Sequence, residues 1–79
     1  MLGQYLKAAR EAAGMTQMDL ATRLRVSQSK VSGIEVGRNA VGADDLSAWS
    51  SALQLTDEQR LEALRLAGLP RESVQPGAA

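Results

Sequence analysis

GMTQMDLATRLRVSQSKVSGIEVGRN, residues 14–39, contains two short helix patterns joined by only two or three residues. Thr16 and Ser27 stand where the two helices are expected to begin, and both are good N-cap residues. Asp19 follows Thr16 by three positions, where its side chain can bond back to the cap. A connection this short forces two helices to cross at a steep angle, and Ala21 offers the small side chain that a close crossing needs. The stretch therefore predicts two short helices packed across one another.

Helical periodicity on both sides of this stretch predicts three more helices. The first covers about residues 2–13, the fourth begins near Asp44, and the fifth covers about residues 56–67. Residues 1–68 are therefore expected to form one compact all-α domain, a bundle of four to five helices, followed by a flexible tail or linker at residues 69–79. The side chains expected to face the core are Leu2, Leu6, Ala9, Ala13, Leu20, Leu24, Val26, Val31, Ile34, Leu46, Trp49, Ala52, Leu53, Leu61, Leu64 and Leu66.

The composition excludes several classes of protein. A chain of 79 residues has room for one domain, and with only 3% aromatic residues and many Leu and Ala it favours helices over strands. Cys and His are absent, so disulfides and the commonest metal ligands and general base are missing, and we expect no enzyme, no cofactor and no metal site. No apolar run is long enough for a membrane span, and no segment is typical of a signal peptide. These features favour a cytoplasmic protein.

The formal net charge is zero, but the charges are unevenly distributed along the chain. Residues 1–42 hold six basic and three acidic side chains, a net charge of +3, whereas residues 43–79 hold three basic and six acidic ones, a net charge of −3. A basic half is typical of a surface that meets phosphate groups, and an ordinary scatter of solvated charges is the alternative. The layout is therefore compatible with nucleic-acid binding despite the neutral total.

The helix that follows Ser27 is expected to present a polar face. With Val31 and Ile34 turned inward, helical geometry leaves five residues pointing outward, namely Gln28, Ser29, Lys30, Ser32 and Gly33. Gln can bond bidentately to adenine, Ser donates or accepts, and Lys reaches guanine or phosphate. The face therefore has the chemistry needed to read the major groove of DNA, and plain solvent-exposed polarity is the alternative.

Residues 14–39 resemble the helix-turn-helix family of the lambdoid phage repressors and Cro proteins, also called the xenobiotic-response-element family. The shared pattern is TQ-x-x-LA…VS-x-S-x-VS-x-IE-x-G, and the flanking LGQYLKAAREAAG and DDLSAWSSALQL match the first and fourth helices, so the resemblance covers about residues 2–67. The arrangement is especially similar to actinobacterial regulators that carry this domain at the N-terminus. The resemblance implies a lambda-repressor-like fold and a transcriptional regulator, such as a repressor, that binds double-stranded DNA, with an inverted repeat bound by a homodimer.

The resemblance also implies roles for single residues. The third helix is the recognition helix of the family, so base edges are expected to be read by Gln28, Ser29 and Lys30. Contacts with DNA phosphates are expected from Gln17, Arg25, Ser32, Arg38 and Asn39. An Arg of the first helix often pairs in this family with the Glu that ends the third, which predicts a partly buried bridge between Arg10 and Glu35.

Two positions depart from the family pattern. Arg25 stands in the turn where the family usually has Gly with a positive φ. Holding a non-Gly residue there costs on the order of 1 kcal/mol, unless the turn is reshaped or a phosphate contact offsets the strain. Gly33 stands where several repressors carry a long polar side chain, which predicts fewer direct base contacts and a larger share of shape readout.

Two further questions stay open at this point. The expected dimer interface is the fifth helix with the loop around it, or a further domain after Ala79. The alternative function is a protein-interaction module, such as an antitoxin or an adaptor with the same fold, which the neutral total charge motivates.

Overall fold

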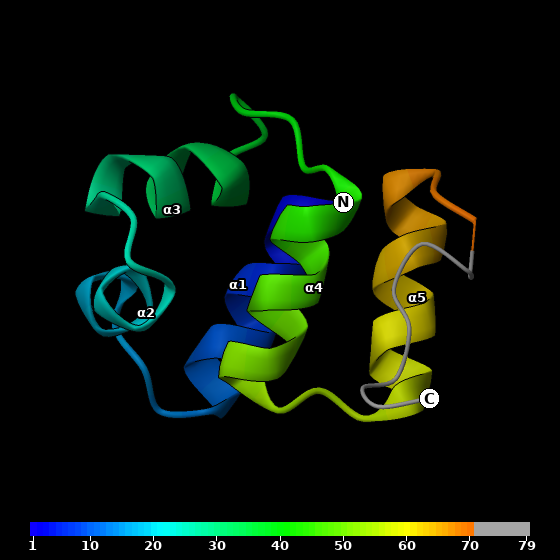
Figure 1. Ribbon diagram of the computed structural model, residues 1–79, viewed down its shortest axis with the longest axis horizontal. Coiled ribbons are helices and arrows are strands. Elements are labelled where there is room, and N and C mark those ends of the chain that lie inside the picture. The colour runs from blue at the N-terminus through cyan, green and yellow to red at the C-terminus, as the bar shows by residue number, and fades with distance from the viewer. Residues whose placement is uncertain (71–79) are drawn as a thin grey trace.

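The computed structural model describes residues 1–70, which form five α-helices and no strand (Figure 1). The helices are α1 (Leu2–Ala12), α2 (Gln17–Leu24), α3 (Gln28–Glu35), α4 (Ala43–Leu53) and α5 (Asp57–Ala67). Measured by length and hydropathy, none of these five helices qualifies as a membrane span. The predicted all-α fold is confirmed, and each of the predicted helices is present.

Side-chain caps fix where α2, α3 and α5 begin. Thr16 Oγ1 accepts the N–H of Asp19 at 3.0 Å, while the Asp19 carboxylate accepts the N–H of Thr16 at 2.9 Å. The bond from that backbone N–H also lowers the pKa of Asp19. Ser27 Oγ accepts the N–H of Lys30 at 3.1 Å, and a second reciprocal pair opens α5 at Thr56. These bonds satisfy N–H groups that the start of a helix leaves without partners, so the predicted caps are confirmed.

A residue with positive φ follows each of the five helices. Gly14 (φ 75°), Gly37 (φ 83°) and Gly68 (φ 71°) lie after α1, α3 and α5, as their positions in the sequence predict. Arg25 (φ 60°) ends α2 and Gln54 (φ 54°) ends α4, both in the left-handed region. A side chain in that region costs on the order of 1 kcal/mol, which the packing of the neighbouring helices must offset.

One hydrophobic core joins the five helices. Helix α1 contacts α3 and α5, α4 contacts α2 and α5, and α2 packs directly on α3. In Figure 1 the pair α2–α3 lies to the left of α1 and α4, and α5 lies to their right, so the α2–α3 corner forms one end of the molecule. The buried hydrophobic side chains are Leu6, Leu20, Ala21, Val31, Ile34, Leu46, Trp49, Leu53, Ala63 and Leu64.

Two side chains that we expected in the core lie at the surface. Leu61 on α5 is 37% exposed, and Ala13 is exposed at the C-cap of α1. Ala63, which the pattern of large apolar residues does not single out, is fully buried in place of Leu61. Because successive residues of a helix are about 100° apart, Leu61, two positions before the buried Ala63, lies on another side of α5. The inward assignment of these two residues was therefore wrong.

The packed part of the chain extends past α5. Leu69, expected at the start of the tail, packs against the core, and its N–H donates to the carbonyl oxygen of Leu64 at 3.0 Å. The part of the expected tail that follows Pro70, residues 71–79, lies outside the described residues. The ordered packing therefore reaches at least Leu69.

Ser50 on α4 is a buried residue whose hydroxyl has no hydrogen-bond partner within residues 1–70. A buried polar group without a partner costs about 1–3 kcal/mol. We therefore expect Ser50→Ala to raise the free energy of unfolding by about 1 kcal/mol, since it removes that group and improves helix propensity. Urea denaturation followed by circular dichroism measures the change. Ser51→Ala, at an exposed site of the same helix, is the matched control for propensity alone, and a gain no larger than this control would contradict the expectation.

Candidate nucleic-acid interface

The α2–α3 corner has the geometry that its sequence predicts. Residues 25–27 connect the two helices, and Ala21 is 1% exposed on α2 where the helices pack together. The turn contains a residue in the left-handed region although no glycine is present: Arg25 adopts φ 60° and ψ 42°. The corner therefore holds α3 in a fixed orientation at one end of the molecule. The two helices cross steeply (Figure 1), and the turn between them contains the strained backbone of Arg25.

One side of α3 faces solvent, and we call it the outer face of α3, made of Gln28, Ser29, Ser32 and Val36. With about 3.6 residues per turn, Gln28, Ser32 and Val36 follow one stripe along the helix, and Ser29 lies beside it. Gln28 and Ser29 are exposed, Ser32 is half-buried and Val36, directly after the last helical residue, is 68% exposed. The outer face is therefore a polar surface with one apolar side chain at its C-terminal end.

Lys30 is exposed, but it lies on the flank of α3 rather than on the outer face. Helical geometry places it next to the buried Ile34, on the side that turns toward α4. Its Nζ lies 3.3 Å from Oδ1 of Asp45 in the first turn of α4. The structure therefore brings Gln28 and Ser29 together as predicted and holds Lys30 apart from them by an ion pair.

Gly33 does not face outward, as the sequence reading had it, but is buried. A Cβ atom at this position would lie 2.4 Å from Nδ2 of Asn39, because the loop after α3 folds back over the helix. The carbonyl oxygen of Gly33 also accepts the N–H groups of Arg38 at 2.8 Å and Asn39 at 3.1 Å. Gly33 is therefore a packing site for the loop. Its missing side chain does not reduce the number of side chains on the outer face, because position 33 does not belong to that face.

A buried ion pair ties α1 to the end of α3. Arg10 Nε donates to Glu35 Oε2 at 2.6 Å, and Nη2 donates to Glu35 Oε1 at 3.1 Å. Arg10 Nη1 also donates to the carbonyl oxygen of Met15 at 2.7 Å, and the hydrogen bond to Glu35 raises the pKa of Arg10. Arg10 is 6% exposed and Glu35 is 5% exposed, so the predicted bridge is confirmed and is more deeply buried than expected.

Gln17, at the first position of α2, connects this ion pair to the outer face of α3. Its Nε2 donates to Glu35 Oε1 at 3.0 Å, and its Oε1 accepts a bond from Gln28 Nε2 at 3.4 Å. A continuous series of bonds thus runs from Arg10 through Glu35 and Gln17 to Gln28. Because one end of the series is buried, the amide of Gln28 is oriented by groups that cannot move freely.

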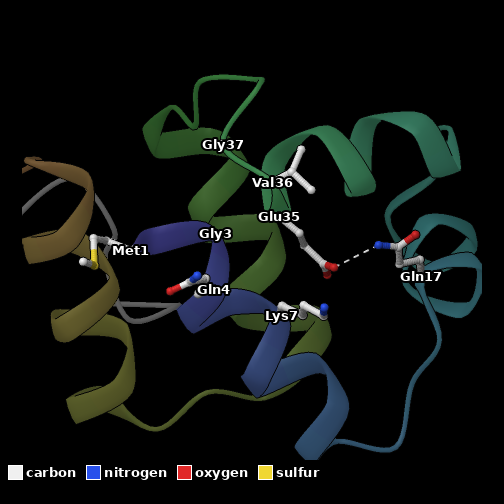
Figure 2. A pocket seen from close by; sticks show the side chains of 8 residues that line it. All are labelled: Met1, Gly3, Gln4, Lys7, Gln17, Glu35, Val36 and Gly37. Atoms are coloured by element: carbon white, nitrogen blue, oxygen red, sulfur yellow. Dashed lines mark hydrogen bonds between the residues drawn. The ribbon is translucent and has the colours of Figure 1, made fainter.

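A recess of about 310 Å³ lies beside this series of bonds (Figure 2). Figure 2 shows Lys7 of α1 and Gln17 of α2 on either side of the Glu35 carboxylate, with Val36 and Gly37 above. Lys7 is exposed and has no ion-pair partner within residues 1–70. Because Arg10 neutralises the charge of Glu35, the charge of Lys7 makes the recess positive overall. Sequence reasoning missed Lys7, because only the folded chain brings it to the same recess as Gln17.

The other basic and polar residues predicted to contact phosphates surround α3. Arg25 is exposed at the turn before the helix, and Arg38 and Asn39 are exposed in the loop after it. Gln17 lies along one side, and Ser32 belongs to the outer face. Sequence reasoning also missed Val36, although its spacing of four from Ser32 places it on this surface. Acidic residues within 1–70 form no cluster suited to a metal ion.

Comparison with known protein families identifies a match that covers most of the chain. A family model described as a helix-turn-helix domain matches residues 1–64, which include α1 to α4 and most of α5. No curated protein and no solved structure matches the chain. The match covers both helices of the corner and the helices that hold them.

Proposed function

The chain belongs to the helix-turn-helix domain family, and from this premise we propose that it is a sequence-specific transcriptional regulator that inserts α3 into the major groove of double-stranded DNA. The resemblance of residues 14–39 to the phage repressors and Cro proteins supports this proposal. The observation that carries the proposal is the exposed outer face of α3, whose Gln28 is oriented by bonds that lead to a buried ion pair. A side chain held in this way loses little freedom when it meets a base.

The proposal assigns base reading to Gln28, Ser29 and Lys30. The amide of Gln28 suits adenine, the hydroxyl of Ser29 suits several base edges, and the ammonium of Lys30 suits guanine or a phosphate. Gln28 and Ser29 are in position on the outer face, whereas Lys30 reaches the duplex from the flank of α3. With few direct contacts available, DNA shape is expected to supply part of the specificity.

Phosphate contacts are proposed on both sides of the helix. Arg25 lies at its N-terminal end, Ser32 on its outer face, and Arg38 and Asn39 at its C-terminal end. Gln17 and the unbonded N–H groups at the start of α2 are proposed to bind a phosphate next to the recess, where Lys7 adds a positive charge. Contacts of this kind make binding strongly dependent on salt.

We also propose that two copies bind an inverted repeat, because one recognition helix reads only a few base pairs. Helix α5 offers an apolar surface for this pairing, a shallow recess of about 320 Å³ lined by Leu61, Leu64, Arg65 and Leu69. Arg65 pairs with Glu62 beside this recess. Antiparallel pairing of two α5 helices would cover Leu61 and bring these opposite charges of the two copies together.

Selection of bound sequences from random duplex DNA tests the proposal. Enrichment of a defined motif supports sequence-specific binding, and two half-sites related by inversion, about one helical turn apart, support the dimer. Enrichment of a single half-site would contradict the proposed dimer but not sequence-specific binding. Binding to all duplexes with equal affinity at moderate salt would contradict a sequence-specific regulator.

Gln28→Ala is expected to relax specificity at one position of the selected site. The variant loses the discrimination of a bidentate contact, about 1–3 kcal/mol at that base pair, and keeps its affinity for random DNA. Fluorescence anisotropy with the selected site and with single-base variants measures this loss. Ser27→Asn, which keeps an N-cap residue outside the outer face, is the control for a change at the start of α3. An equal loss on selected and random DNA would contradict the role of Gln28 in base reading.

A further inference from the structure

Asp45 contacts Lys30 with one carboxylate oxygen and caps α4 with the other. Its Oδ1 lies 3.3 Å from Lys30 Nζ, and its Oδ2 accepts the N–H of Gly42 at 3.3 Å, in the bond that caps α4. Asp45 is half-buried, with 32% of its side chain exposed, while 44% of the Lys30 side chain is exposed. The cap therefore fixes the carboxylate in place, and the flexible lysine is the partner that adapts to it.

The position of this pair matters because Lys30 is the one basic residue within α3. A free ammonium beside the outer face would attract the phosphates of any duplex, whatever its sequence. Such attraction raises affinity for random DNA and carries no sequence information. Asp45 places a negative charge against that ammonium from the neighbouring helix, so the local charge of the α3 flank is close to zero.

We propose that Asp45 is a specificity-determining residue: it acts as an intramolecular counter-ion that keeps Lys30 from binding phosphates at random. This inference rests on the proposed function of the chain as a DNA-binding protein. At the correct site Lys30 gains a contact with a base edge, which compensates for breaking its ion pair with Asp45. At other sites Lys30 keeps that ion pair. Asp45 thereby widens the difference in affinity between selected and random DNA without touching either.

The chain offers a matched pair of variants for this test. Asp45→Asn removes the charge but keeps an oxygen that can accept the N–H of Gly42, so the cap on α4 is retained. Asp44→Asn makes the same change in net charge one residue away, at an exposed residue that has no ion-pair partner within residues 1–70. Both variants alter the first turn of α4, so the difference between them reports the contact with Lys30.

Fluorescence anisotropy titrations with random duplex DNA over a range of salt concentrations give the expected effect. Asp45→Asn frees Lys30 for one more phosphate contact, so the slope of log K against log salt becomes steeper by about 0.9. At low salt its affinity for random DNA rises by about fivefold, a magnitude set by the same counterion release. Asp44→Asn leaves the slope unchanged. Affinity for the selected site changes less, so the ratio of selected to random binding falls in Asp45→Asn.

Lys30→Met supplies the second arm, because it keeps the aliphatic stem and removes the charge. If Asp45 acts through Lys30, the gain of Asp45→Asn disappears in the double variant Lys30→Met/Asp45→Asn. A gain that persists there, or an equal gain in Asp44→Asn, would overturn the inference and leave the proposed function intact. If the wild-type chain binds no duplex at all, the proposed function fails and this inference fails with it.

Discussion

Arg10→Ala is expected to lower the free energy of unfolding by about 3–5 kcal/mol, the cost of leaving a buried charge without its partner. Glu35 is 5% exposed and receives two bonds from Arg10, so its carboxylate would stay buried after the substitution. A domain of this size has a total stability of roughly 3–5 kcal/mol. The free energy of unfolding of the variant should therefore be close to zero, so a large fraction of its molecules should be unfolded at room temperature. Urea denaturation followed by circular dichroism, compared with the wild-type chain, measures the loss.

Removing both partners separates the cost of a stranded charge from the value of the pair. The double variant Arg10→Met/Glu35→Leu has no buried charge, and we expect it to recover most of the stability lost in Arg10→Ala. It should nevertheless bind DNA less specifically, because Gln17 then loses the Glu35 oxygen that orients it toward Gln28. If Arg10→Ala remained as stable as the wild-type chain, the buried bridge would be contradicted.

Gly3→Ala is expected to destabilise the fold by about 3 kcal/mol through overpacking. A Cβ atom at Gly3 would lie 2.3 Å from the carbonyl oxygen of Glu35 and 2.6 Å from that of Ile34. Both contacts are with backbone atoms, so no side-chain rotation can relieve them, and α1 must move away from α3. The gain in helix propensity of about 1 kcal/mol from Gly to Ala is too small to compensate. Thermal denaturation measures the effect.

Gly42→Ala is the control for this prediction. Gly42 is the N-cap of α4, and nothing lies within 4 Å of the position that its Cβ would take. We expect a loss of at most about 1 kcal/mol, from the poorer capping by Ala. Equal losses in the two variants would show that α1 does not approach α3 at Gly3 as closely as described.

The sequence alone predicts those parts of the fold that depend on local chemistry. Capping bonds join residues only three positions apart, so they can be predicted from the sequence. Helix starts were identified in this way at Thr16, with Asp19, and at Ser27. The crossing of α2 and α3 follows from a short connection and a small Ala21. The Arg10–Glu35 bridge joins residues far apart in the chain, and it was predicted only because a family resemblance supplied the pairing.

The features that sequence reasoning missed depend on where a distant segment lies. Gly33 was predicted to point outward because its position in the helix is compatible with exposure. The loop that covers it could not be foreseen, because its path follows no periodic pattern in the sequence. Lys30 was assigned to base edges without knowledge that Asp45 of another helix lies beside it. Leu61 was placed in the core because periodicity weighs large apolar residues, while in the structure α5 turns the small Ala63 inward and leaves Leu61 at the surface. Each of these outcomes is set by tertiary packing.

The covered glycine at position 33 also limits how this domain can be re-engineered. A combinatorial library that varies every residue of α3 would include position 33, yet any larger residue there must displace the Asn39 side chain, which lies where its Cβ would be. Clones carrying such changes would alter the contact of the loop with α3 together with the recognition surface. Diversity for new targets is better confined to Gln28, Ser29, Ser32 and Val36, whose side chains can change without disturbing the interior.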